Sequence, residues 1–419
     1  MRFTPFATIR WFSPQAICLL LLLCLAGLGL PHGATAAEQA EPDKLSLQDS
    51  RILYQAQQHF QKTDYRQCCR VLEEYLQGHP GNRHGQFLQL LGNSYFRMKD
   101  FKQAQAAYKR GLELHPQDPM FHLNLALALE NDEQWRMAGE QYISAYGLQK
   151  ESDPQLLYQA ASLLTRTKQY RRAAEVLGQL IKAHPPARTE WLELQLYVNF
   201  ELQDYPAAIR VTEQLLAREP EKVAYWQQLA GLQLHCKQYL SAAAAYEVAY
   251  QVREPSRQDL EQLADLYLYL NLPLRAAETL ERIATDKRSR ADLERLARLY
   301  WRGGLPEKAN RCLNRILDRW PDAQAYQLKA QLLYEQSAYK QTLQLLETAC
   351  DKYPEHAELH LQRGFAAWQL EDWNQAAKSF TVARRFKRTR GSADAALEII
   401  EVMRSQPANI PQTAMHRAP

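Results

Sequence analysis

Histidine and cysteine are the residue types in this chain that could bind a metal ion or act as nucleophiles. His356 and His360 stand four residues apart in the segment His-Ala-Glu-Leu-His, and this spacing places both imidazoles on one face of a helix. The helical zinc hydrolase motif needs Glu directly after its first His, whereas this chain has Ala357 there. We therefore expect two solvated histidines rather than a zinc site.

The cysteines beyond residue 36 are irregularly spaced, and they are Cys68, Cys69, Cys236, Cys312 and Cys350. An odd number with no C-x-x-C pair indicates neither a disulfide framework nor a zinc site. Most are expected to be small buried apolar residues. The adjacent Cys68 and Cys69 cannot easily close a ring without distorting the peptide between them, and a redox role for this pair is the alternative.

Motifs for phosphate binding and hydrolysis are absent from the sequence, which contains no G-x-x-x-x-G-K-[ST], G-x-G-x-x-G or G-x-S-x-G segment. We therefore predict that the chain is not an enzyme and has no cofactor. Catalysis by the His356/His360 pair or by Cys68 and Cys69 is the alternative from a different functional class.

Helices are the elements expected to position these residues. The 419-residue chain is 46% hydrophobic, has only 16 glycines and lacks runs of alternating β-branched residues. Leu, Ala, Gln, Glu and Arg dominate, and all of them favour helices. The composition thus predicts an all-α protein with a continuous apolar core.

The first 36 residues have the pattern of a secretory signal peptide. Arg2 and Arg10 precede an apolar run over residues 17–30, and small residues follow at 34–37. The run is too short for a typical membrane span, so we expect cleavage and a periplasmic protein without an integral membrane segment. Anchoring to the inner membrane by an uncleaved signal is the alternative. Cleavage lowers the formal charge from +4 to +2, and this near-neutral balance argues against nucleic acid as a partner.

Prolines recur about every 34 residues along the rest of the chain. They are Pro80, Pro116, Pro154, Pro185, Pro220, Pro255, Pro321 and Pro354. Because proline cannot continue a helix, this period indicates helix-turn-helix units. Ten units are expected, starting near residues 49, 85, 119, 154, 189, 223, 257, 290, 323 and 357 and forming an array over 49–390. A linker at 37–48, a capping helix at 391–405 and a disordered tail at 406–419 complete the predicted organisation.

Small residues stand at the eighth and twentieth places of most units. Eight units match at both places, as Gly92 with Ala104 and Gly364 with Ala376 illustrate. Leu196 occupies one of these places in the fifth unit, and Thr342 does so in the ninth. This pattern resembles the tetratricopeptide repeat, in which the small residues let two helices touch closely. The resemblance implies an α-solenoid superhelix whose repeats create a core by stacking, ending in a capping helix.

The resemblance also implies where a partner binds, because the first helix of each tetratricopeptide unit lines the concave face. Aromatic residues and arginines on that face are suited to protein contacts. The candidate partner-binding residues are Tyr158, Tyr197, Phe200, Tyr269, Arg298, Trp301, Arg302, Tyr334, Phe365 and Trp368. Packing between helices is the alternative role for each of them.

Three segments carry a more specific resemblance, and they cover residues 225–234, 258–267 and 272–277. They are similar to the periplasmic tetratricopeptide proteins found beside TonB, ExbB and ExbD. This similarity implies a non-catalytic periplasmic adaptor in TonB-dependent energy transduction, which binds a protein or peptide partner of the cell envelope. A scaffold for polysaccharide, outer-membrane or pilus assembly is the alternative.

A basic cluster follows the last unit and contains Arg384, Arg385, Lys387, Arg388 and Arg390. It is either a contact surface for anionic lipid or an acidic partner, or a solvated helix end whose cations favour the helix dipole.

Overall fold

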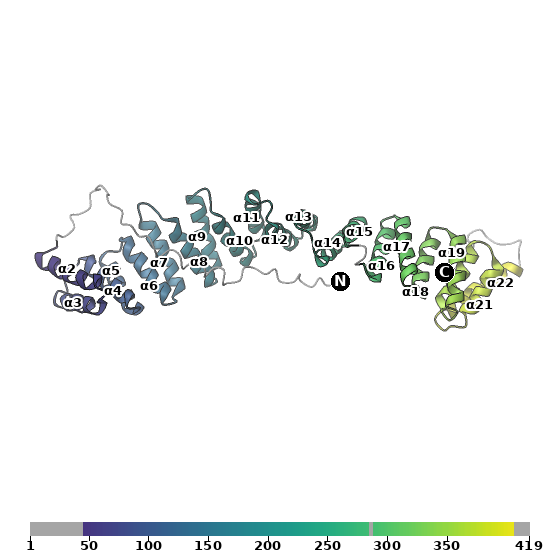
Figure 1. Ribbon diagram of the computed structural model, residues 1–419, viewed down its shortest axis with the longest axis horizontal. Coiled ribbons are helices and arrows are strands. Elements are labelled where there is room, and N and C mark those ends of the chain that lie inside the picture. The colour runs from purple at the N-terminus through teal and green to yellow at the C-terminus, as the bar shows by residue number, and fades with distance from the viewer. Residues whose placement is uncertain (1–44, 285–287, 406–419) are drawn as a thin grey trace. The chain divides into compact units, whose positions relative to one another are not determined.

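A computed structural model describes residues 45–284 and 288–405, and over these residues the chain forms 21 helices and no strand (Figure 1). The predicted signal peptide, the linker up to residue 44 and the predicted tail at 406–419 lie outside the described residues. The all-α solenoid expected from the sequence is confirmed.

Ten helix pairs follow one another along the chain, and a single helix closes the series. The first helices of the pairs are α2(Leu47–Gln61), α4(Gly85–Arg97), α6(Pro119–Asn131), α8(Pro154–Arg166), α10(Thr189–Glu201), α12(Val223–His235), α14(Arg257–Tyr269), α16(Arg290–Arg302), α18(Ala323–Glu335) and α20(Ala357–Gln369). The second helices are α3(Tyr65–Gly78), α5(Phe101–Leu114), α7(Trp135–Leu148), α9(Tyr170–Ala183), α11(Tyr205–Arg218), α13(Tyr239–Val252), α15(Pro273–Glu281), α17(Pro306–Arg319), α19(Tyr339–Lys352) and α21(Trp373–Ala383). The closing helix is α22(Arg390–Ser405).

The described residues divide into two compact units between Glu133 and Gln134. The first unit ends with α6 and the second begins with α7. Within each unit, helices that are neighbours in sequence pack against each other.

The small residues of the repeat lie where two helices approach closely. A Cβ atom added to Gly92 would lie 2.3 Å from Cε1 of Tyr108, and one added to Gly364 would lie 2.4 Å from Cε1 of Phe380. Only glycine leaves room for these rings. The deviating unit with Thr342 keeps the fold because its hydroxyl donates to the carbonyl of Ala338 at 3.0 Å and is fully buried.

The turn inside each pair has the same backbone shape. One residue per turn has a positive φ between 57° and 75°, and it is glycine only at Gly304. The others are Thr63, Lys99, Glu133, Lys168, Gln203, Lys237, Asn271, Ser337 and Glu371. Aspartates then cap several of the second helices, as Asp204 does by accepting the Ala207 amide at 3.0 Å. These turns fix where each second helix starts.

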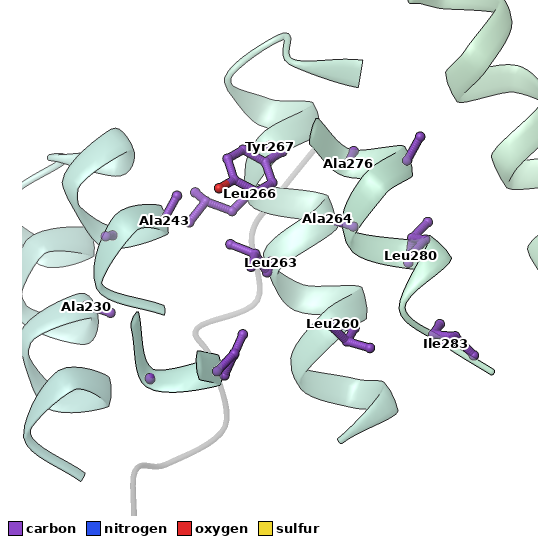
Figure 2. Close-up of a cluster of buried hydrophobic side chains, with 14 of the residues drawn as sticks. Ala230, Ala243, Leu260, Leu263, Ala264, Leu266, Tyr267, Ala276, Leu280 and Ile283 are labelled. Atoms are coloured by element: carbon purple, nitrogen blue, oxygen red, sulfur yellow. The ribbon is translucent and has the colours of Figure 1, made fainter. Parts of the chain in front are cut away.

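Neighbouring pairs share a core and specific polar contacts. In Figure 2, Leu263 and Leu266 of α14 face the preceding pair, whereas Leu260 lies on the side of α15. The buried Tyr267 of α14 also donates its hydroxyl to Oε1 of Glu247 on α13 at 2.5 Å. The same arrangement joins Tyr95 of α4 to Glu73 of α3, so this contact between successive repeats recurs in both units.

The closing helix α22 covers the end of the last pair. Ala393, Ala396 and Ile400 are buried in a cluster with residues of α20 and α21, and Met403 packs against it. This packing covers apolar side chains of the last pair.

Candidate interaction surface

The two histidines of the His-Ala-Glu-Leu-His segment have separate structural roles. His356 precedes α20 as its N-terminal flanking residue and is not part of the helix, so the expected shared helical face does not form. His360 is buried, and its Nε2 lies 2.8 Å from the carbonyl oxygen of Pro354. The expectation of two solvated histidines was therefore wrong for His360. Burial is also the main cause that lowers the pKa of its imidazole.

The five cysteines are free thiols, and all except Cys236 are buried. Burial raises the pKa of Cys69 to about 12 and is the largest cause of the raised pKa of Cys68. A thiol with a raised pKa is a poor nucleophile at neutral pH. Over residues 45–284 and 288–405, no three His, Cys, Asp or Glu side chains converge as metal ligands.

Three of the predicted partner-binding residues take part in aromatic contacts in the second unit. Tyr197 and Phe200 lie one turn apart on α10, and Tyr269 ends α14 with 52% of its surface exposed. The ring of Tyr197 lies 6.3 Å from that of Tyr170, and the ring of Tyr269 lies 4.6 Å from that of Tyr239. Tyr197, Phe200 and Tyr269 therefore lie near the C-terminal ends of first helices. Their partners Tyr170 and Tyr239 are the first residues of second helices.

Tyr170, Tyr205, His235 and Tyr239 complete this set and were not predicted. Tyr205 stacks on His235 at 4.5 Å, and both contact Phe200 at 6.0 Å. A signal for three of them was present in the sequence, because an aromatic residue recurs at the first position of most second helices. Those residues are Tyr65, Phe101, Trp135, Tyr170, Tyr205, Tyr239, Tyr339 and Trp373.

We call Tyr170, Tyr197, Phe200, Tyr205, His235, Tyr239 and Tyr269 the aromatic row. All seven are half-buried or exposed. Each contact between rings either lies within one pair or joins two neighbouring pairs. The row therefore joins four successive pairs, from α9 to α14, and presents ring edges and faces to solvent.

Apolar and cationic side chains lie near members of the aromatic row in sequence. Leu240 and Leu272 are exposed beside Tyr239 and Tyr269 in sequence. Four residues before Tyr170 in sequence, the guanidinium of Arg166 lies 3.7 Å from the ring centre of Trp135. Rings held by their neighbours and still accessible lose little conformational entropy when they bind a partner.

Arg298, Trp301 and Arg302 lie at the end of α16, two helices beyond the last member of the row. Arg298 is exposed and pairs with Glu294 at 3.6 Å, and Arg302 is exposed. Trp301 is half-buried against the core of the unit. These three side chains therefore offer a second, smaller group of aromatic and cationic atoms.

Tyr158 and Tyr334 are two further predicted residues outside the aromatic row. Tyr158 is half-buried, and burial followed by the charges of Glu190 and Glu193 raises the pKa of its hydroxyl. Tyr334 packs edge-on against Tyr339 with ring centres 5.2 Å apart. Tyr334 is half-buried like Tyr158.

Trp368 and Phe365 of α20 belong to the terminal core. Trp368 is only 5% exposed and packs edge-on against Trp373 and Phe380, with ring centres 5.6 and 6.3 Å away. Phe365 also packs against Phe380 at 5.1 Å. The closing helix α22 contributes to this core, which explains why Trp368 does not have the exposed position expected of it.

The basic cluster after α21 is exposed and partly neutralised. Arg384 pairs with Asp394 at 2.8 Å, and Arg388 pairs with Glu358 at 2.6 Å. Nε of Arg390 donates to the carbonyl of Arg384 at 3.2 Å. Two cations of the cluster thus take part in holding the turn between α21 and α22.

None of the helices in the described ranges is both long enough and apolar enough to cross a membrane.

Comparisons with protein families find tetratricopeptide repeats in three segments. Residues 92–132 match one repeat model, and residues 158–211 and 294–357 match another. The second model covers Tyr170, Tyr197, Phe200 and Tyr205 of the aromatic row. No curated protein is significantly similar to the chain in sequence.

Solved structures of the same type are similar at low identity. A tetratricopeptide repeat protein from Parabacteroides merdae ATCC 43184 is 16% identical over 59% of this chain and 98% of its own, with a TM-score of 0.29. The P58(IPK) TPR domain is 12% identical over 86% and 99%, with a TM-score of 0.26. MamA from Desulfovibrio magneticus RS-1 is 18% identical over 39% and 92%, with a TM-score of 0.32.

Proposed function

Because the chain contains tetratricopeptide repeats, which generally mediate protein–protein interactions, we propose that it is a non-catalytic adaptor that binds a protein or peptide along the aromatic row. The observation that carries this proposal is the row itself: seven accessible rings from four successive helix pairs, each held by a neighbouring ring. Tyrosines in such a setting supply large contact area and hydroxyl groups for hydrogen bonds.

The specific partner that we propose is the TonB, ExbB and ExbD machinery of the cell envelope, with the chain in the periplasm. Two features of the sequence support this proposal. The first 36 residues have the pattern of a signal peptide, and residues 225–234, 258–267 and 272–277 resemble periplasmic proteins found beside those components. The segment 258–267 covers most of α14, which ends at Tyr269 of the aromatic row.

The experiment is crosslinking in cells that express the tagged full chain, followed by identification of the captured proteins. Recovery of TonB, ExbB or ExbD supports the specific proposal. Recovery of polysaccharide, outer-membrane or pilus assembly factors instead would refute the TonB assignment and leave the adaptor function in place.

A pair of variants tests whether the aromatic row is the contact surface. Tyr269→Ala removes a row residue that is 52% exposed, whereas Tyr54→Ala removes an equally accessible tyrosine, 64% exposed, on α2 in the other unit. We expect Tyr269→Ala to reduce capture at least about tenfold, as for a hot-spot tyrosine, and Tyr54→Ala to leave it unchanged. Equal capture by both variants would place the contact elsewhere.

A further inference from the structure

A cavity of about 210 Å³ lies at the end of α15 and is lined by arginines. Its walls are Arg288, Leu293, Arg315, Asp318 and Arg319. The cavity accompanies an irregularity of the repeat, because α15 has 9 residues whereas the second helices before and after it, α13 and α17, have 14 each.

Arg288 is fixed by the shortened helix end. Its Nε donates to the carbonyl of Ile283 at 3.0 Å, and one of its terminal nitrogens donates to the carbonyl of Glu281 at 2.5 Å. A guanidinium has five N–H groups, so about three remain for another acceptor. Arg319 is also oriented, because its guanidinium lies 4.7 Å from the ring centre of Trp320.

The arginines around the cavity lack carboxylate partners among the described residues. Arg288, Arg315 and Arg319 form no ion pair with any carboxylate of 45–284 or 288–405, although Asp318 stands in the same wall. Two other arginines, Arg257 and Arg290, do form ion pairs with carboxylates. Arg257 pairs with Asp292 at 2.5 Å, and Arg290 pairs with Glu294 at 2.8 Å.

Like charges also stand close together here. Arg315 and Arg319 are four residues apart on α17, where two cations repel each other unless an anion lies between them. The buried thiol of Cys312 provides an independent sign of this convergence. Burial and the charge of Glu281 raise its pKa, while the charges of Arg315, Arg288 and Arg311 lower it, so Arg288 and Arg315 lie near one sulfur atom together with one carboxylate.

We propose that the cavity lined by Arg288, Arg315 and Arg319 binds the phosphate group of an anionic ligand. Guanidinium forks match phosphate oxygens in pairs, and several forks around one site suit a group with three oxygens better than a single carboxylate. The volume corresponds to about seven water molecules at ~30 Å³ each, which leaves room for a phosphate and part of the group that carries it. The site is separate from the aromatic row and does not depend on its function.

The test is isothermal titration of the purified chain with inorganic phosphate, at ionic strength held constant with chloride. We expect saturable binding at one site, at least about tenfold weaker in Arg315→Gln/Arg319→Gln because two charged donors are lost. Arg315→Lys keeps the charge and loses the fork, so it should also weaken binding. Arg210→Gln on α11 is the matched control, because Arg210 is likewise an exposed arginine of a second helix.

A second arm identifies the source of the phosphate. Vesicles of phosphatidylcholine with phosphatidylglycerol that sediment the chain, but not the double variant, would assign the site to lipid headgroups. Phosphate binding without vesicle binding would assign it to a soluble phosphate ester. The proposal is overturned if the chain shows no saturable phosphate binding, or if the double variant, shown to be folded by circular dichroism, binds phosphate as tightly as Arg210→Gln does.

Discussion

The hydrogen bond between Tyr267 and Glu247 couples two successive helix pairs, and its removal is the most direct test of how the repeats stabilise each other. Tyr267→Phe deletes the hydroxyl that donates to Oε1 of Glu247 at 2.5 Å and keeps the ring, which is 4% exposed. The change therefore removes one polar contact from an otherwise unchanged core.

The magnitude follows from the surroundings of the two groups. A hydrogen bond to a charged group contributes about 1.5–3 kcal/mol to stability. The Glu247 side chain keeps 34% of its surface exposed, so water can solvate its carboxylate after the change, and Arg275 lies 4.0 Å away. We therefore expect Tyr267→Phe to lower the free energy of unfolding by about 1.5 kcal/mol, near the lower end of that range.

The assay is urea unfolding at pH 7 for the wild type, Tyr267→Phe, Glu247→Gln and the double variant. If the two side chains act through this bond, the double variant should lose less than the sum of the single losses, with a coupling of about 1 kcal/mol. Additive losses, or a loss below about 0.3 kcal/mol for Tyr267→Phe, would refute the reasoning.

The same bond predicts a dependence on alkaline pH. Burial first, and then the contact with Glu247, raises the pKa of Tyr267 above its usual value near 10. The folded state thus favours the protonated hydroxyl, so this contribution is complete below pH 10 and is lost as the pH rises above it. Tyr267→Phe should show a weaker loss of stability than the wild type between pH 9 and 11.

Four further substitutions test other parts of the fold by urea unfolding. Gly364→Ala should destabilise by about 1–2 kcal/mol because its Cβ would lie 2.4 Å from Phe380, whereas Gly178→Ala, with open space around it, should stabilise by about 0.5–1 kcal/mol. Lys237→Gly should stabilise by about 0.5–1 kcal/mol, since φ is 58° there. Hydrogen bonds from Ser46 and Tyr75 lower the pKa of Asp49. The stability that the Asp49 carboxylate contributes should therefore be complete above pH 4 and decline as the pH falls below it, and Asp49→Asn should lack this contribution.

The repeat could be predicted from the sequence because its signals are local. Prolines before first helices and small residues at helix contacts depend on the neighbouring 34 residues alone, and both recur in phase. Gly92 and Gly364 illustrate this, since each stands where a ring of the paired helix fills the space that a Cβ would need.

The candidate surface was predicted only in part, because exposure depends on packing beyond one repeat. Trp368 has the sequence position of a surface residue but is buried with Trp373 and Phe380 in a core that α22 helps to form. His356 does not share a helical face with His360, because α20 begins at Ala357, the residue after His356. The arginine cavity was missed because the short helix α15, which precedes Arg288, ends at Glu281 without a proline or glycine to mark the end.

The most direct measurement of the central claim is photo-crosslinking in cells from a benzoylphenylalanine placed at Tyr269, with the same group placed at Tyr54 as the control. The account predicts a discrete adduct with one envelope protein from position 269 and none from position 54, and mass spectrometry identifies that protein. No adduct from position 269, or the same adduct from both positions, would contradict the assignment of the aromatic row as the binding surface.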